Sequence, residues 1–71
     1  MTDRETAELW ENLRELRLQF PEMRLGQLIA NLAVVARGTD PGAVWDMEDE
    51  ELLSAAKWQL AEVAARTADV A

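Results

Sequence analysis

The sequence predicts an all-α fold, a small three-helix bundle that forms a single domain over residues 1–71. Apolar residues recur at spacings of three and four in three segments, which is the period of an amphipathic helix. Both prolines and two of the three glycines fall between those segments, and such short connections favour antiparallel neighbours. With 71 residues and no cysteine, the chain is close to the smallest size at which an apolar core holds a fold without help.

The first helix is expected over residues 2–20. Thr2 and Glu5 have the spacing of a capping box, in which a cap hydroxyl and a later glutamate satisfy the first backbone N–H groups. Pro21 ends the helix because it disfavours the α conformation of the residue before it. Leu18 lies opposite the apolar stripe. That stripe consists of Leu9, Leu13, Leu16 and Phe20.

The second helix is expected over residues 23–37. Gly26 costs about 1 kcal/mol relative to alanine inside a helix, which indicates that another backbone packs closely against it. Residues 38–42 form a loop with an Asp-Pro-Gly turn, and we expect Trp45 to enter the core and close this loop between the second and third helices. The apolar face of the second helix consists of Leu25, Leu28, Ile29, Leu32, Val35 and Ala36.

The third helix is expected over residues 46–66, and the tail at residues 67–71 is expected to fray. Asp46 is the predicted cap, and the acids that follow it complement the helix dipole. Trp58 lies off the inner face. That face consists of Leu52, Leu53, Ala56, Leu60, Val63 and Ala64. The acidic face consists of Asp46, Glu48, Asp49, Glu50 and Glu51.

Acidic residues outnumber basic residues by fourteen to seven, which gives a net charge of −7. The excess lies in residues 38–71, which hold eight acids and two bases. This charge opposes binding to nucleic acids, whose phosphates attract lysine and arginine, and adsorption to anionic membranes. The polar N-terminus does not resemble a secretory signal, and no apolar run is long enough to span a membrane. The sequence therefore predicts a cytoplasmic protein that binds neither nucleic acid nor membranes.

Few residues are available for catalysis. The chain has no histidine and no cysteine, so it lacks the usual general base, the thiol nucleophile and the common zinc ligands. Ser54 and Lys57 share one side of the third helix, but three short helices leave little room for a cleft. The acidic run lacks the alternating ligands and central glycine of a calcium loop. We therefore expect no enzyme, no catalytic residue, no metal site and no cofactor.

Arg24, Gln27 and Asn31 form a narrow polar stripe on the second helix. As a recognition stripe, they would bind a carboxylate or the peptide backbone of a partner. As internal ties, Arg24 would pair with the acidic start of the third helix, and the carboxamides would bond carbonyls of the following loop.

Leu18 and Trp58 are either ordinary exposed apolar residues or part of a partner surface, where tryptophan is common. The acidic face is either a helix start with solvated carboxylates or a surface that imitates phosphates.

Two short motifs carry a resemblance to known proteins. Residues 21–31 join a helix-ending proline to an Arg-Leu-Gly-Gln-x-x-x-Asn helix, and residues 45–52 place a tryptophan before an acidic helix start. In both respects the chain resembles a group of small uncharacterised bacterial proteins, over about residues 9–60. Members often carry two adjacent aromatic residues where this chain has Val44 and Trp45. The resemblance implies a helical fold and a bacterial origin, and it implies no activity.

The sequence favours a non-enzymatic protein–protein interaction module. Burial of its few large apolar side chains only about offsets the ordering entropy, so a bundle of this size benefits from a partner protein or from a second copy in a homodimer. The alternative is an acidic protein that imitates nucleic acid and inhibits a basic protein. The candidate partner-binding residues are Arg24, Gln27, Asn31, Leu18 and Trp58.

Overall fold

The computed structural model describes residues 1–70, and the side chains of residues 1–67. Its helices are α1 (Asp3–Gln19), α2 (Leu25–Arg37), α3 (Ala43–Asp46) and α4 (Asp49–Val70). No strand occurs in this described part of the chain. The predicted all-α fold class is therefore confirmed, whereas the single turn α3 was not expected from the sequence.

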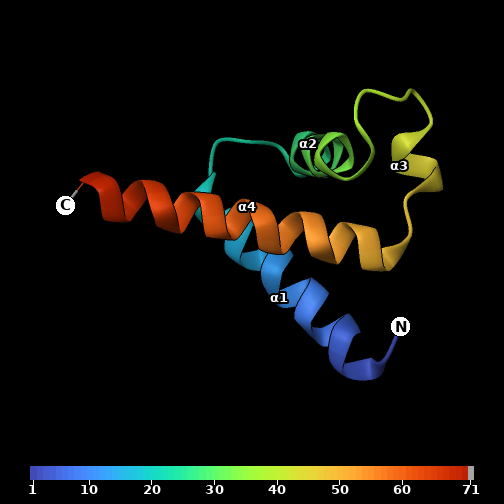
Figure 1. Ribbon diagram of the computed structural model, residues 1–71, viewed down its shortest axis with the longest axis horizontal. Helices are drawn as coiled ribbons and strands as arrows, with labels where there is room; N and C mark the ends of the chain where they lie inside the picture. Colours follow the sequence, from blue (N-terminus) through green and yellow to red (C-terminus); the bar gives the residue numbers. More distant parts are fainter. Residues whose placement is uncertain (71) are drawn as a thin grey trace.

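Helix α4 is the central element of the fold, and α1 and α2 pack on different sides of it (Figure 1). Contact between α1 and α2 is slight. Figure 1 shows α2 end-on while α4 runs across the picture, so these two helices cross steeply. Helix α1 runs in the same general direction as α4. The expectation that consecutive helices are antiparallel is wrong, because α2 crosses α4 steeply and the non-helical residues between α1 and α2 redirect the chain across α4 instead of folding it back along α1.

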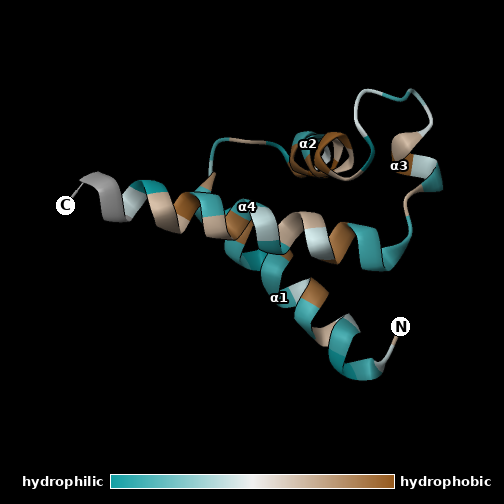
Figure 2. Ribbon diagram, in the orientation of Figure 1, coloured by the Kyte–Doolittle hydropathy of each residue, from teal (hydrophilic) through white to brown (hydrophobic). Residues whose placement is uncertain are grey.

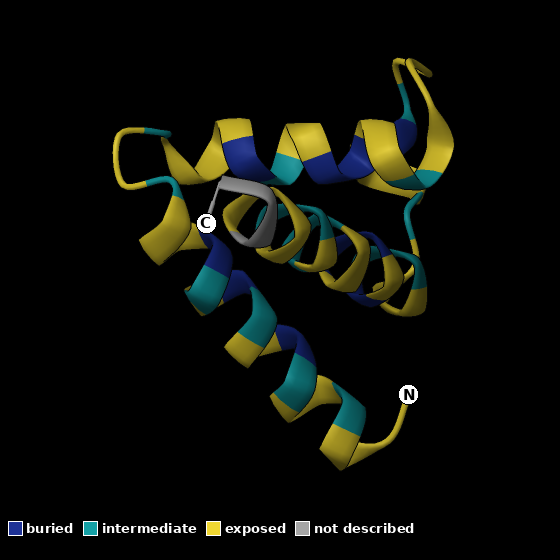
Figure 3. Ribbon diagram, turned by 60° about the vertical axis from the view of Figure 1, so that its left-hand side comes forward, coloured by how far each residue is buried: buried dark blue, intermediate teal, exposed yellow. Residues whose placement is uncertain are grey.

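The core lies on both flanks of α4, where apolar bands of all three long helices face inward (Figures 2 and 3). Leu16 and Leu32 are its largest fully buried side chains, with 0% and 1% of their surface exposed. Small residues fill the remaining space, so the helices approach closely. The buried core cluster consists of Leu9, Leu13, Leu16, Leu28, Leu32, Leu53, Ala55 and Ala56. Leu25, which was expected in the core, is 55% exposed because it opens α2, one turn before the part that packs on α4.

The start of α1 agrees with the predicted capping box. The Glu5 backbone N–H donates to Thr2 Oγ1 at 3.1 Å, and the Thr2 backbone N–H donates to Glu5 Oε1 at 3.1 Å. The bond from the Thr2 backbone N–H, followed by the bond that the Thr2 hydroxyl donates to Glu5 Oε1 at 3.0 Å, lowers the pKa of Glu5. At the other end of α1, Arg17 Nη1 donates to the carbonyl of Pro21 at 3.0 Å.

The glycine inside α2 and the glycine that follows its last residue have different conformational roles. Gly38 follows the last turn with φ of 76°, a conformation that strongly favours glycine, and its N–H donates to the Val34 carbonyl at 2.7 Å. At Gly26, by contrast, an added Cβ would meet no atom within 4 Å. The expected close packing at Gly26 is therefore wrong.

The predicted lid formed by Trp45 is also wrong, because Trp45 is 92% exposed. The reason is the single turn α3, in which Ala43 is only 4% exposed and takes the inward position against α2. Residues two apart on a helix differ by about 200° in direction, so Trp45 points outward when Ala43 points inward. The small alanine, and not the tryptophan, closes this connection.

The start and the end of α4 differ from the expected boundaries. Asp46 ends α3 and does not cap α4. Glu48 takes the cap position, since its carbonyl accepts the Leu52 N–H at 3.1 Å and its own N–H donates to Glu51 Oε1 at 3.1 Å. Helix α4 continues to Val70, beyond the expected helix end at residue 66. Ala71, the last residue of the expected tail, lies outside the described residues.

Candidate functional site

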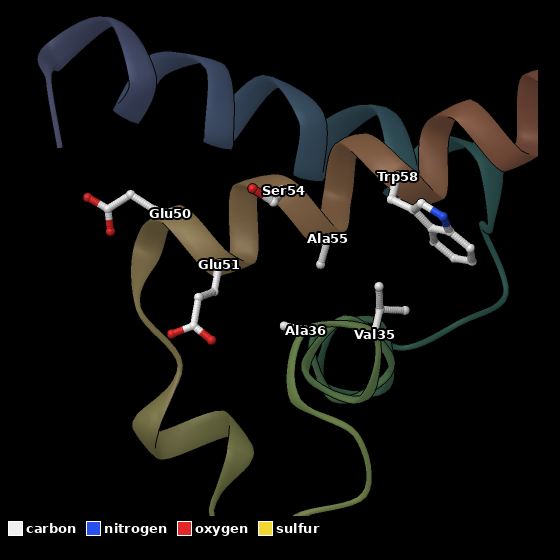
Figure 4. A pocket seen from close by; sticks show the side chains of 7 residues that line it. All are labelled: Val35, Ala36, Glu50, Glu51, Ser54, Ala55 and Trp58. Carbon is white, nitrogen blue, oxygen red and sulfur yellow. The ribbon is translucent and has the colours of Figure 1, made fainter.

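An open groove lies between the second half of α2 and the first half of α4 (Figure 4). Its volume is about 650 Å³. Figure 4 shows Val35 and Ala36 on α2 facing Ala55 and Trp58 on α4, with the indole ring of Trp58 beside Val35. The side chains that line the groove belong to Val35, Ala36, Glu50, Glu51, Ser54, Ala55 and Trp58.

The groove exists because small side chains alternate with large ones along the α2–α4 seam. Ala55 is 3% exposed and Ala36 is half-buried, so these two alanines form a low floor. Trp58 stands at one end of this floor and remains 52% exposed, and Val35 beside it is 41% exposed. The floor is therefore apolar and largely buried, and the wall formed by Trp58 and Val35 is apolar and open to solvent.

The other end of the groove is acidic and is organised by an ion pair. Arg37 donates from Nε to Glu51 Oε2 and from Nη2 to Glu51 Oε1, each at 2.9 Å. The hydrogen bond from Arg37, followed by that from the Glu48 backbone N–H, lowers the pKa of Glu51. The bond between Arg37 and Glu51 also raises the pKa of Arg37. The neighbouring Glu50 side chain is 55% exposed and lies 3.4 Å from the N-terminal amine.

Arg37 thus forms the ion pair with the acidic helix start that the sequence suggested for Arg24. The two arginines lie at opposite ends of α2, which at 1.5 Å per residue are about 20 Å apart. The chain leaves α2 at Arg37 and enters α4 shortly afterwards, so only Arg37 comes near the acidic turn. The proposed pairing of Arg24 with that turn is therefore wrong. No ion pair of Arg24 is found within the described residues.

The carboxamides of the predicted polar stripe have internal partners, although not the expected loop carbonyls. Gln27 Oε1 accepts the Arg24 backbone N–H at 3.0 Å and thereby caps its own helix. Asn31 Nδ2 donates to the sulfur of Met23 at 3.5 Å. Asn31 also lines a second, smaller hollow of about 140 Å³ between the end of α1, α2 and α4. The stripe therefore does not face the groove.

The remaining predicted site residues are dispersed. Leu18 on α1 is 59% exposed and does not line the groove. Of the acidic face, only Glu50 and Glu51 reach the groove. Across the residues that the structure describes, no three acidic side chains come close enough together to hold a metal ion. Of the five candidate partner-binding residues, the structure places only Trp58 in the groove.

The sequence reasoning missed Val35 and Ala36 as groove residues because their apolar character also fits a core position. The available signal was the clustering of alanine on the facing helices, at positions 33 and 36 and at positions 55 and 56. Such clusters indicate close helix packing, and a large side chain next to them leaves a hollow. Arg37 could have been found as the last base before the acidic helix start.

The chain matches no protein-family model, and no curated protein or solved structure is significantly similar to it. The resemblance to small bacterial proteins stays a prediction. In the described part of the chain, none of the helices combines the length and the apolar composition that crossing a bilayer requires.

Proposed function

We propose that this chain is a non-enzymatic protein-binding module, and that a partner protein docks in the groove between α2 and α4. The observation that carries the proposal is the half-exposed indole of Trp58 above an alanine floor, beside the exposed Val35. Tryptophan in a desolvated pocket contributes strongly to binding in protein complexes. A partner side chain placed on this floor would remove apolar surface of Trp58 and Val35 from water, which is favourable by about 25 cal/mol per Å².

The chemistry of the groove supports binding in preference to catalysis. Ser54 is its only hydroxyl group among the lining residues. The chain has no histidine to act as its base, and an unactivated serine hydroxyl is a weak nucleophile. Glu51, whose pKa is lowered by Arg37, remains charged at neutral pH and is engaged in an ion pair, so it is poorly suited to donate a proton.

The acidic alternative, in which the chain imitates nucleic acid, receives less support from the geometry. A phosphate-like surface requires a row of uncompensated negative charges. Glu51 is occupied by Arg37, and Glu50 lies within 4 Å of the N-terminal amine. Two carboxylates of the acidic run are therefore partly compensated within the chain itself.

The test compares two tryptophan variants as baits. The wild-type chain, Trp58→Ala and Trp10→Ala are used to capture proteins from a lysate of the cells that encode the chain. Trp10 is a matched control because it is 67% exposed on α1 and does not line the groove. A captured protein counts only after it is purified and binds the isolated chain with the same ranking.

We expect the purified partner to bind the wild type and Trp10→Ala equally, and Trp58→Ala at least tenfold more weakly, as for a tryptophan hot spot. Circular dichroism establishes that both variants are folded. Equal binding of all three proteins would remove the groove from the interface and overturn the proposal.

A further inference from the structure

We infer that the occupant of the groove is a short amphipathic helix of the partner, with an apolar side chain against Trp58 and a lysine or arginine at the Glu50–Glu51 end. This inference rests on the proposed function and adds the chemical class of the partner segment. It combines two properties of the groove, its length along α4 and the opposite character of its two ends.

The first property is the spacing of the two ends. Trp58 and Glu51 are seven residues apart on α4, which corresponds to about 10 Å along the helix axis. An incoming helix that lies along the seam has the same rise, so its residues i and i+7 reach both ends of the groove. The floor of Ala36 and Ala55 leaves room for a leucine-sized side chain between the two helices.

The second property is the charge of the acidic end. Arg37 compensates Glu51 there. The N-terminal amine partly compensates Glu50 at 3.4 Å, but the Glu50 side chain keeps 55% of its surface in contact with solvent and accessible to a second cation. Asp46 also acts on the Arg37 guanidinium through its charge, which places a further carboxylate near this end. An ammonium or guanidinium group on the occupant is attracted to this end, and a carboxylate is repelled.

The same charges argue against a second copy of this chain as the occupant. Each copy carries a net charge of −7, so two copies repel one another at close range. A two-fold symmetric dimer through this groove would also bring both acidic ends into one interface. A basic helix from another protein meets neither obstacle.

The inference can be tested with designed peptides and a single fluorescent reporter. In the variant Trp10→Phe/Trp45→Phe, both replaced side chains are exposed, and Trp58 remains as the only tryptophan. This protein is titrated with a helical peptide that carries leucine and lysine seven residues apart. One control peptide has glutamate in place of lysine, and another has the same composition in scrambled order.

We expect the lysine peptide to cause a saturable blue shift of Trp58 emission that weakens as the salt concentration rises. The glutamate and scrambled peptides should cause no saturable change. Glu50→Gln should weaken binding of the lysine peptide several-fold. Glu11→Gln, which removes the same charge from an exposed position on α1, should leave it unchanged.

Any one of four results would overturn the inference. Equal binding of the glutamate peptide would show that charge does not select the occupant, and equal binding of the scrambled peptide would show that a helical pattern is not recognised. A dimer that forms by light scattering and dissociates in Trp58→Ala would identify a second copy as the occupant. If no peptide binds while a purified partner still depends on Trp58, the helix inference fails and the protein-binding proposal stands.

Discussion

Arg37 and Glu51 form a two-point ion pair, in which the Nε and Nη2 groups of Arg37 donate to both carboxylate oxygens of Glu51 at 2.9 Å. The pair joins the last turn of α2 to the first turn of α4 across the connection that contains α3. About one third of each side chain remains exposed, 34% for Arg37 and 32% for Glu51. Such a pair contributes little to stability in water, but its planar geometry orients one end of the groove.

This pair predicts a specific acid dependence of stability. Because Arg37 lowers the pKa of Glu51 from its ordinary 4.5, ionised Glu51 stabilises the folded state above the unfolded pKa. That contribution is lost as the pH falls through the lower folded pKa. In urea unfolding from about pH 7 to about pH 3, we expect Glu51→Gln to be less stable than the wild type at neutral pH and to lose less stability on acidification.

The control for this measurement is Glu11→Gln, which also removes one carboxylate but from an exposed position on α1. Its stability should follow the acid dependence of the wild type. A constant difference between Glu51→Gln and the wild type at every pH would contradict the assigned role of the ion pair.

Two leucines of α1 should differ sharply in their effect on stability. Leu16 is 0% exposed in the core and Leu18 is 59% exposed. Leu16→Ala should lower the free energy of unfolding by about 2–5 kcal/mol, because it leaves a cavity, and a domain this small is then close to unfolded. Leu18→Ala should change it by less than about 0.5 kcal/mol. Urea titration followed by circular dichroism measures both values, and similar losses would contradict the orientation of α1.

Replacement of two glycines by alanine should have opposite effects. Gly38 has φ of 76°, so Gly38→Ala should destabilise the fold by roughly 1–2 kcal/mol. Gly26 lies inside α2 with no atom near the position of an added Cβ, so Gly26→Ala should stabilise it by about 0.5–1 kcal/mol. Thermal unfolding of the two variants measures the effects. A loss of stability in Gly26→Ala would indicate a close contact at that position.

The exposure of Trp45 predicts its fluorescence. In the variant Trp10→Phe/Trp58→Phe, the remaining Trp45 is 92% exposed, and its emission should resemble that of free tryptophan in water. Acrylamide should quench it more strongly than it quenches Trp58 in Trp10→Phe/Trp45→Phe, because Trp58 is only 52% exposed. A blue-shifted, poorly quenched Trp45 would instead support the buried lid that the sequence suggested.

The sequence predicted the local features of the fold well. The capping box of Thr2 and Glu5 formed as expected, because it depends on residues within one turn. The apolar stripe of α1 supplied three buried leucines, Leu9, Leu13 and Leu16. Boundaries were less accurate near the acidic turn, where a single turn of helix ending at Asp46 and a new cap at Glu48 replaced one continuous start.

The candidate site was predicted much less completely. Trp58 was singled out because it lies off the inner face of its helix, and the structure places it in the groove. Val35 and Ala36 were assigned to the apolar face of α2 without a separate role. Their position in the groove depends on the steep crossing of α2 over α4 (Figure 1). This crossing cannot be predicted from the spacing of apolar residues within a single helix.

The sequence by itself determined that the chain is helical, where its apolar stripes lie and that it is strongly acidic, because these properties follow from neighbouring residues. Only the tertiary structure decided that Arg37 and not Arg24 meets the acidic turn, and that Ala43 and not Trp45 faces the core. The physical reason is that both outcomes depend on the path of the chain between helices. That path determines which ends come within a few ångströms of each other and which side of a single turn faces inward.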